Sequence, residues 1–138
     1  MALYTAGDVD GMAALCSPDS LLDYIATGRS GQGKIHEVGV PMWRTFVAHF
    51  DGFRPEVVEV WEDTAKNTAF VATINRGIQR KDVSGIPSSG GEMAAPHLFI
   101  LALGGDGRIA KITAYFDYLT MYRQLGFPTG FAKQIGAR

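Results

Sequence analysis

Two side chains in the C-terminal half of the sequence are suited to proton-transfer chemistry, because a histidine and a carboxylate lie on neighbouring strand-like segments. His97 begins one apolar segment, Asp117 ends the next, and the glycine-rich turn 104–107 joins them. Apolar surroundings raise the pKa of a carboxyl group until it can act as a general acid or base near neutral pH. A histidine at the same pocket can donate a hydrogen bond to a carbonyl or enolate oxygen. The pair therefore indicates a candidate catalytic site.

Strand alternation decides which way these two side chains point. Asp117 shares the more polar face of its strand with Thr113 and Tyr115, and we expect an acid–base role if that face lines a pocket. A second role is compatible with the first, since Asp117 also precedes a helix-like segment and is a suitable N-cap. His97 shares an apolar stripe with Phe99, where a histidine either lies at a pocket or is a core residue with a satisfied hydrogen bond.

Composition and charge narrow the class of protein. The chain has 138 residues, 46% of them hydrophobic, and a formal net charge of −1. We expect one domain over residues 1–138, with a core that folds without metal or disulfide. The near-neutral charge argues against a nucleic-acid or membrane partner and favours a small, largely apolar molecule as the ligand.

The single cysteine and the spacing of the histidines carry further expectations. Cys16 lies in an apolar run, so we expect a buried thiol and a reducing compartment. Because the sequence shows neither a leader nor a run of about eighteen apolar residues, a cytoplasmic location is expected. His36 and His49 lack partners at metal-ligand spacing, and no phosphate-binding motif occurs. We therefore expect no metal and no cofactor.

Hydrophobic periodicity places helices first and strands afterwards. This order is typical of an α+β domain in which N-terminal helices pack on one face of a curved antiparallel sheet. The loop 82–96 is the longest expected connection. The expected helices are Ala2–Cys16, stepped at Gly7-Asp8, and Lys34–Phe50, with a kink or a new start at Pro41; the expected strands are Leu21–Ala26, Pro55–Glu62, Thr68–Gln79, His97–Leu103 and Arg108–Asp117; a helical turn follows over Tyr118–Leu125.

Aromatic side chains are distributed over both the helices and the sheet. Most of them belong to the core, and a few at the mouth of a pocket would suit a polycyclic or terpenoid ligand. The residues expected to contact substrate are Tyr24, Trp43, Phe46, Trp61, Phe99 and Tyr115.

Several short motifs, in this order and spacing, resemble the SnoaL-like branch of the nuclear-transport-factor-2-like superfamily, over roughly residues 4–126. This resemblance implies an α+β fold with a cone-shaped pocket. The motifs are Thr5-Ala6-Gly7-Asp8-Val9-Asp10-Gly11-Met12 leading into Ser17-Pro18-Asp19, then Gly33-Lys34-Ile35, Gly107-Arg108-Ile109, Tyr115-Phe116-Asp117 and Arg123-Gln124-Leu125-Gly126.

The resemblance also implies roles for the two candidate catalytic residues. Asp117 matches a catalytic aspartate of the related epoxide hydrolases and SnoaL-like cyclases. His97 lies on the strand where the related ketosteroid isomerases carry an acidic donor to the developing enolate. If Thr113 and Tyr115 face the cone, the opposite apolar face of that strand needs cover, and a homodimer would supply it.

Three departures from the family pattern narrow the chemistry. The first helix is short, which leaves the pocket wider or leaves it to a partner subunit to cover. Tyr24 occupies the region of the isomerases' general base, and Asp23 points to the opposite face by alternation. The stretch 73–75 stands where epoxide hydrolases need an arginine and an aspartate, and Arg76 does not fit that role, so epoxide hydrolysis is disfavoured.

Two functions remain. The first is a cofactor-independent cyclase or isomerase of a polyketide-like carbonyl compound that uses Asp117 and His97, with a dehydratase or epoxide hydrolase as a further alternative. The second is a non-catalytic ligand-binding or dimerising module of the same fold.

Overall fold

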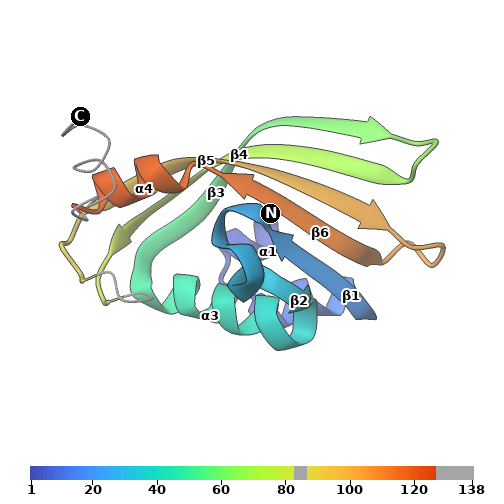
Figure 1. Cartoon of the computed structure of the whole chain (residues 1–138), viewed down its shortest axis with the longest axis horizontal. Coiled ribbons are helices and arrows are strands. Elements are labelled where there is room, and N and C mark those ends of the chain that lie inside the picture. The colour runs from blue at the N-terminus through green and yellow to red at the C-terminus, as the bar shows by residue number, and fades with distance from the viewer. Residues whose placement is uncertain (83–86, 127–138) are drawn as a thin grey trace.

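The computed structural model describes residues 1–82 and 87–126, and within these ranges it contains six strands and four α-helices (Figure 1). A 3₁₀ segment, η1, lies between the first two strands, and a π-helical turn, η2, lies between the second strand and the third α-helix. The elements are α1 Ala2–Thr5, α2 Val9–Ala14, β1 Cys16–Tyr24, η1 Ile25–Gly31, β2 Gln32–Lys34, η2 Ile35–Gly39, α3 Val40–His49, β3 Phe50–Asp63, β4 Thr68–Gln79, β5 Glu92–Leu103, β6 Ile109–Phe116 and α4 Tyr118–Gln124.

The strands form one sheet in the order β2-β1-β6-β5-β4-β3. Short turns make the neighbours β3–β4 and β5–β6 antiparallel, and β4–β5 is antiparallel as well. The pair β1–β6 is parallel, so the sheet is mixed at this one junction, where the last strand joins the first. The predicted α+β architecture, with N-terminal helices against one face of the sheet, is confirmed (Figure 1).

The sheet face that lies against the helices, called here the inner face, carries the core. Buried side chains alternate along the strands, as Val71 and Thr73 do on β4 and Ile112 and Ala114 on β6. From the helical layer α3 buries Trp43. Alternation and an amphipathic helix therefore build the apolar interior together.

The N-terminal part of the sheet differs from the prediction. β1 begins at Cys16, because the turn-like residues 17–20 form an irregular bulge between two points of pairing with β6 rather than a loop. β2 pairs with β1 in a segment where the sequence predicts no strand. The chain leaves β1 after Tyr24 and enters η1, so the strand predicted to reach Ala26 ends two residues earlier.

Other boundaries also move. Pro41 lies in the first turn of α3 after the turn η2, which is the new helix start that the sequence allowed. β3 begins at Phe50 and β5 at Glu92, so the strands are longer than hydrophobic periodicity predicts. The predicted loop 82–96 is shortened accordingly, and its residues 83–86 lie outside the described part of the chain.

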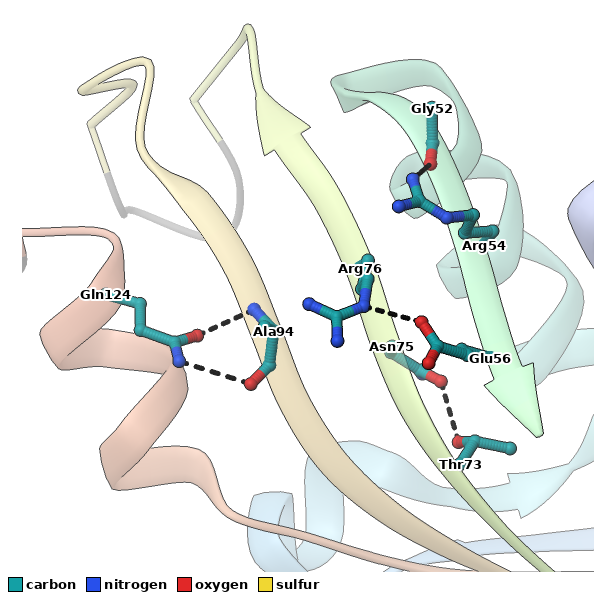
Figure 2. A network of polar contacts seen from close by, with 8 residues as sticks. All are labelled: Gly52, Arg54, Glu56, Thr73, Asn75, Arg76, Ala94 and Gln124. Atoms are coloured by element: carbon teal, nitrogen blue, oxygen red, sulfur yellow. Dashed lines mark hydrogen bonds and ion pairs between the residues drawn. The ribbon is translucent and has the colours of Figure 1, made fainter. Parts of the chain in front are cut away.

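Asp117 is the N-cap of α4. Its Oδ1 accepts a hydrogen bond from the Thr120 amide at 2.9 Å, and its Oδ2 accepts one from Thr120 Oγ1 at 2.5 Å. The helix buries Met121, and its Gln124 side chain bonds to both the amide and the carbonyl of Ala94 on β5 (Figure 2). The backbone amide of Asp117, which donates a hydrogen bond to the carbonyl of Pro96 at 3.2 Å, ties the start of α4 to β5, and Gln124 ties its end.

The cap gives a stability prediction. Replacing Asp117 by Ala removes an acceptor for the first turn of α4 and should lower the free energy of unfolding by about 1 kcal/mol. Asp117→Asn, which also caps helices, should lose less than half of that. Urea unfolding followed by circular dichroism measures both variants, and equal stabilities for Asp117→Ala and the wild type would contradict the cap.

Candidate functional site

The interior contains two adjoining cavities. The larger, here called the outer chamber, has a volume of about 310 Å³ and an apolar wall. The smaller, the inner chamber, has a volume of about 30 Å³ and a more polar wall. The outer chamber is lined by Met1, Ala2, Leu3, Tyr4, Met12, Leu15, Cys16, Tyr24, Trp43, Phe99, Leu101, Ile109 and Ile112. The inner chamber is lined by Tyr4, Tyr24, Met42, Phe46, Phe53, Asn75, Met93, His97, Phe116 and Met121.

Two buried tyrosines, Tyr4 and Tyr24, line both chambers and form the waist between them. Trp43 Nε1 donates a hydrogen bond to Tyr24 Oη at 3.1 Å, so the Tyr24 hydroxyl keeps its own proton to donate. Burial raises the pKa of Tyr24 to about 12. Burial, and secondarily the neighbouring Tyr24, raise the pKa of Tyr4 well above its usual value. Both phenols are therefore neutral hydrogen-bond donors at physiological pH.

His97 points its ring into the inner chamber between two phenyl rings. The ring centroids of Phe116 and Phe99 lie 4.9 Å and 5.7 Å from that of the imidazole, with the planes nearly parallel. His97 Nδ1 lies 3.0 Å from the carbonyl oxygen of Ala95. Because a carbonyl can only accept, this contact assigns the proton to Nδ1 and leaves Nε2 with its lone pair.

The charge state of His97 follows from its surroundings. Burial lowers the pKa of the imidazole to about 4, although the bond to Ala95 opposes this effect. At neutral pH the ring is uncharged, and its Nε2 is an acceptor of hydrogen bonds and protons. The sequence predicted a donor at this position; the geometry favours a base.

Asn75 is a polar residue of the inner chamber that the sequence interpretation did not assign. It is buried on β4, and its Oδ1 accepts a hydrogen bond from Thr73 Oγ1 at 2.8 Å (Figure 2). With the oxygen engaged in this way, the amide has its N–H groups to offer to a ligand. The sequence signal was alternation alone, which puts Asn75 on the same face of β4 as the buried residues Val71 and Thr73.

The expected placement of Asp117 in an apolar pocket is wrong. Its carboxylate is exposed, lines neither chamber, and has a lowered pKa because Thr120 donates two hydrogen bonds to it. The cause is which face of β6 is turned inward. Ile112, Ala114 and Phe116 face the interior, and Asp117 follows on the opposite side. The geometry brings His97 into the chamber and leaves Asp117 outside as a helix cap.

The residues expected to contact substrate divide into two groups. Tyr24, Trp43 and Phe99 line the outer chamber, and Phe46 lines the inner one. Trp61 and Tyr115 lie on the outer face of the sheet and are 45% and 47% exposed, so their expected placement at the pocket is wrong. Their cross-strand partners explain this, because Phe70 and Leu98 also belong to the face turned away from the helices.

Other expectations concern the first strand, the thiol and metals. Asp23 points away from the interior and accepts a hydrogen bond from Gln32 Nε2, as alternation with Tyr24 predicts. Cys16 is buried, as expected. Over residues 1–82 and 87–126, no group of three His, Cys, Asp or Glu side chains is arranged to hold a metal ion. None of the helices in these ranges is long and apolar enough to cross a membrane.

A mixed sheet curved over helices, with an internal apolar chamber, defines the class of α+β cone-shaped proteins. A family model of the SnoaL-like domain matches residues 1–112. The chain therefore belongs to the SnoaL-like family, and the resemblance seen in its motifs is confirmed.

Solved structures agree with this assignment. A candidate polyketide cyclase from Pseudomonas putida superposes with a TM-score of 0.75 at 23% identity, covering 90% of each chain. IdmH, a candidate polyketide cyclase from Streptomyces antibioticus, gives a TM-score of 0.74 at 21% identity, covering 91% of each chain. A protein with a ketosteroid isomerase-like fold from Catenulispora acidiphila gives 0.73 at 16% identity, covering 92% of this chain and 88% of that one. At these identities the likeness establishes the fold. No curated protein sequence matches the chain.

The partly buried imidazole of His97 makes the free energy of unfolding depend on pH. The folded pKa of His97 is about 4 and lies below the usual value of 6.5, so the unfolded chain binds its proton first as pH falls. Stability from this group is complete above the unfolded pKa and should decrease by up to about 3 kcal/mol between pH 6.5 and 4. Urea unfolding across this range should show the decrease in the wild type and a smaller one in His97→Gln.

The control for this series is His36→Gln, which changes an exposed histidine. It should follow the wild-type pH dependence. If the free energy of unfolding depended on pH in the same way in the wild type and in His97→Gln, the imidazole of His97 would have the same pKa in the folded and the unfolded chain. That result would contradict the effect of burial described above.

Proposed function

We propose that this protein is a cofactor-independent acid–base enzyme of the cyclase or isomerase type that acts on a small, largely apolar carbonyl compound. The observation that carries the proposal is the orientation of His97, whose Nδ1 is engaged by Ala95 and whose Nε2 is left as an acceptor. The same chamber is lined by Asn75 and Tyr24, which supply donors. Removal of a proton next to a carbonyl requires a base and donors in this arrangement.

The proton transfer proceeds in two steps. His97 Nε2 takes a proton from the carbon next to the substrate carbonyl, and the electron pair of that C–H bond forms an enolate. The Tyr24 hydroxyl, and with it the Asn75 amide, donates hydrogen bonds to the enolate oxygen. Isomerisation follows when the substrate has a β,γ double bond, because the enolate is then a dienolate and the imidazolium returns the proton to its γ carbon, which moves the double bond to the α,β position. Ring closure follows when the enolate carbon attacks a second carbonyl of the same molecule and the imidazolium protonates the new alkoxide.

The chamber walls support the proposed substrate class. The outer chamber is lined mostly by aliphatic and aromatic side chains, and at about 310 Å³ it suits a compound of one or two rings. Its polar groups are concentrated at the waist, which favours a ligand that is apolar at one end and carries its carbonyl at the other. The names of the candidate polyketide cyclases among the structural relatives support the same class of reaction.

Asp117 has a positioning role in this proposal. Its cap fixes the start of α4, and α4 carries Met121 into the wall of the inner chamber. The carboxylate itself takes no part in the proton transfer. The pathway through His97 therefore replaces the proton shuttle by Asp117 that the sequence suggested.

Hydrogen–deuterium exchange tests the proposal without knowledge of the natural substrate. The protein should accelerate exchange of the protons next to the carbonyl of 4-phenyl-2-butanone in D₂O, followed by proton NMR. His97→Gln should lower the accelerated rate by about 10²-fold or more, and Tyr24→Phe should lower it by roughly tenfold to a hundredfold. The wild-type rate should be constant above about pH 5 and decline with a midpoint of about 4, because protonated His97 cannot accept a proton.

The matched control is Asp117→Asn, which removes the charge and keeps a capping side chain. It should exchange the protons of 4-phenyl-2-butanone at the wild-type rate. Equal rates for His97→Gln and the wild type would overturn the proposed base, and loss of exchange in Asp117→Asn would return the proton transfer to the carboxylate.

A second function, association with another copy, is favoured by the outer face of the sheet. Its cross-strand pairs align Trp61 with Phe70 and Phe70 with Ile100, and Tyr115 pairs with Leu98 in the next row. Within the described ranges, α1, α2 and α3 lie on the opposite side of the sheet (Figure 1). We propose that two copies of the chain pack these apolar rows together, since an exposed apolar patch is typical of the centre of such interfaces.

Neighbouring residues on β3 test this association, because they point to opposite faces. Trp61→Asp places a charge in the proposed interface and should convert a dimer to a monomer, as measured by size-exclusion chromatography with light scattering. Val60→Asp changes a residue of similar exposure whose partner, Val71, is on the inner face, and it should remain dimeric. A wild type that is monomeric at micromolar concentration, or a dimeric Trp61→Asp variant, would contradict the interface.

A further inference from the structure

The waist between the two chambers is made of one fixed and one weakly held tyrosine. Tyr24 is on a strand, and its hydroxyl accepts the hydrogen bond from Trp43. The Tyr4 hydroxyl makes no hydrogen bond to any residue in the described ranges. Tyr4 is held by ring packing, with its centroid 4.7 Å from that of Phe53 and 6.4 Å from that of Trp43.

The element that carries Tyr4 is also weakly anchored. α1 has four residues and no side-chain bond at its N-cap, and Gly7 leaves the helical conformation shortly after it with a φ of +72°. A helix of one turn gains little stability from its own hydrogen bonds. Rotation of the Tyr4 side chain, or a small shift of α1, therefore costs less than displacement of Tyr24.

The two volumes determine what can reach His97. At about 30 Å³ the inner chamber has room for a water molecule or a carbonyl group and none for a ring. The outer chamber has room for the rest of the ligand. A carbonyl that reaches His97 from the outer chamber therefore passes between Tyr4 and Tyr24, while its apolar part stays outside the waist.

We propose that Tyr4 is the specificity-determining partition of this pocket, and that it admits carbonyl compounds with a narrow, unbranched carbonyl end. Branching next to the carbonyl keeps a ligand in the outer chamber. The proposal rests on the proposed function for its choice of ligand, whereas its mechanism is steric and independent of catalysis. Tyr4→Ala merges the two chambers and removes the discrimination.

Ligand binding observed at His97 tests the partition. The chain has three histidines, so the imidazole NMR signal of His97 is assigned by its absence in His97→Gln. In the wild type, 2-nonanone should shift this signal, and 2,2-dimethyl-3-octanone, which has a tert-butyl group on its carbonyl, should bind at least roughly tenfold more weakly or leave the signal unchanged. In Tyr4→Ala both ketones should shift it, with affinities within about twofold of each other.

Two further variants test whether the discrimination depends on the Tyr4 hydroxyl or on the overall stability of the fold. Tyr4→Phe keeps the ring and should discriminate like the wild type. Val9→Ala truncates a buried core residue of α2 that lines neither chamber, so it should also discriminate. The partition is overturned if Tyr4→Ala keeps the wild-type preference, if Tyr4→Phe loses it, or if neither ketone shifts His97 in any variant.

The outcomes are distinguishable from those of the exchange experiment. If the wild type discriminated between the two ketones but accelerated no proton exchange, the role of Tyr4 would stand and the proposed enzymatic activity would be wrong. If proton exchange depended on His97 and Tyr4→Ala kept the wild-type discrimination between the two ketones, the proposed activity would stand and the role of Tyr4 would be wrong.

Discussion

The hydrogen bond from Trp43 to Tyr24 is the interaction on which the interior depends. It joins the helical layer to the first strand in a place from which water is excluded, so each group would be costly to bury without the other. By fixing Tyr24 it also fixes one side of the waist and divides the interior into an apolar and a polar part. A structural requirement, the satisfaction of a buried indole N–H, thereby creates an oriented phenol with a proton to donate.

The same requirement explains the rest of the polar interior. Thr73 satisfies the oxygen of Asn75, and the carbonyl of Ala95 satisfies Nδ1 of His97. Each of these bonds involves one side of a two-sided polar group and leaves the other side directed to a ligand. The inner chamber is consequently small, but its few polar atoms have defined donor and acceptor roles.

The sequence predicts where strands and helices lie along the chain, because hydrophobic periodicity determines that. It does not predict which face of a strand is turned to the interior. The strand Thr68–Gln79 and the helical turn after Asp117 are long or well-signalled patterns, and both are confirmed. The inward face of β6 was misjudged, because polarity alone suggested that the side with Thr113 lines a pocket. Alternation establishes that two faces exist, but only packing against helices and neighbouring strands decides which of them is buried.

The uncertainty about which side of a strand is buried also explains why His97, and not Asp117, lies in the chamber. A residue just beyond a strand end has no neighbour to hold it inward, and Asp117 instead satisfies the amides of the helix that follows. His97 lies within β5, where the pairing with β4 and β6 fixes its direction. Asn75 was overlooked for a related reason, since its significance comes from the chamber it lines and not from a motif.

Apolar burial has opposite consequences for the basic and the acidic groups of this interior, and both consequences favour the proposed chemistry. It keeps the imidazole of His97 uncharged and the phenol of Tyr24 protonated, because each charged form is poorly solvated there. Burial makes His97 a weak base, so the proton transfer depends on donors at the enolate oxygen to lower its barrier. The imidazolium and the enolate form together and within one small chamber, and their mutual attraction in a medium of low polarity offsets part of the cost of creating two charges. A ligand whose carbonyl stopped in the outer chamber would meet the Tyr24 hydroxyl but neither the imidazole of His97 nor the Asn75 amide, so the passage between Tyr4 and Tyr24 decides reactivity as well as binding.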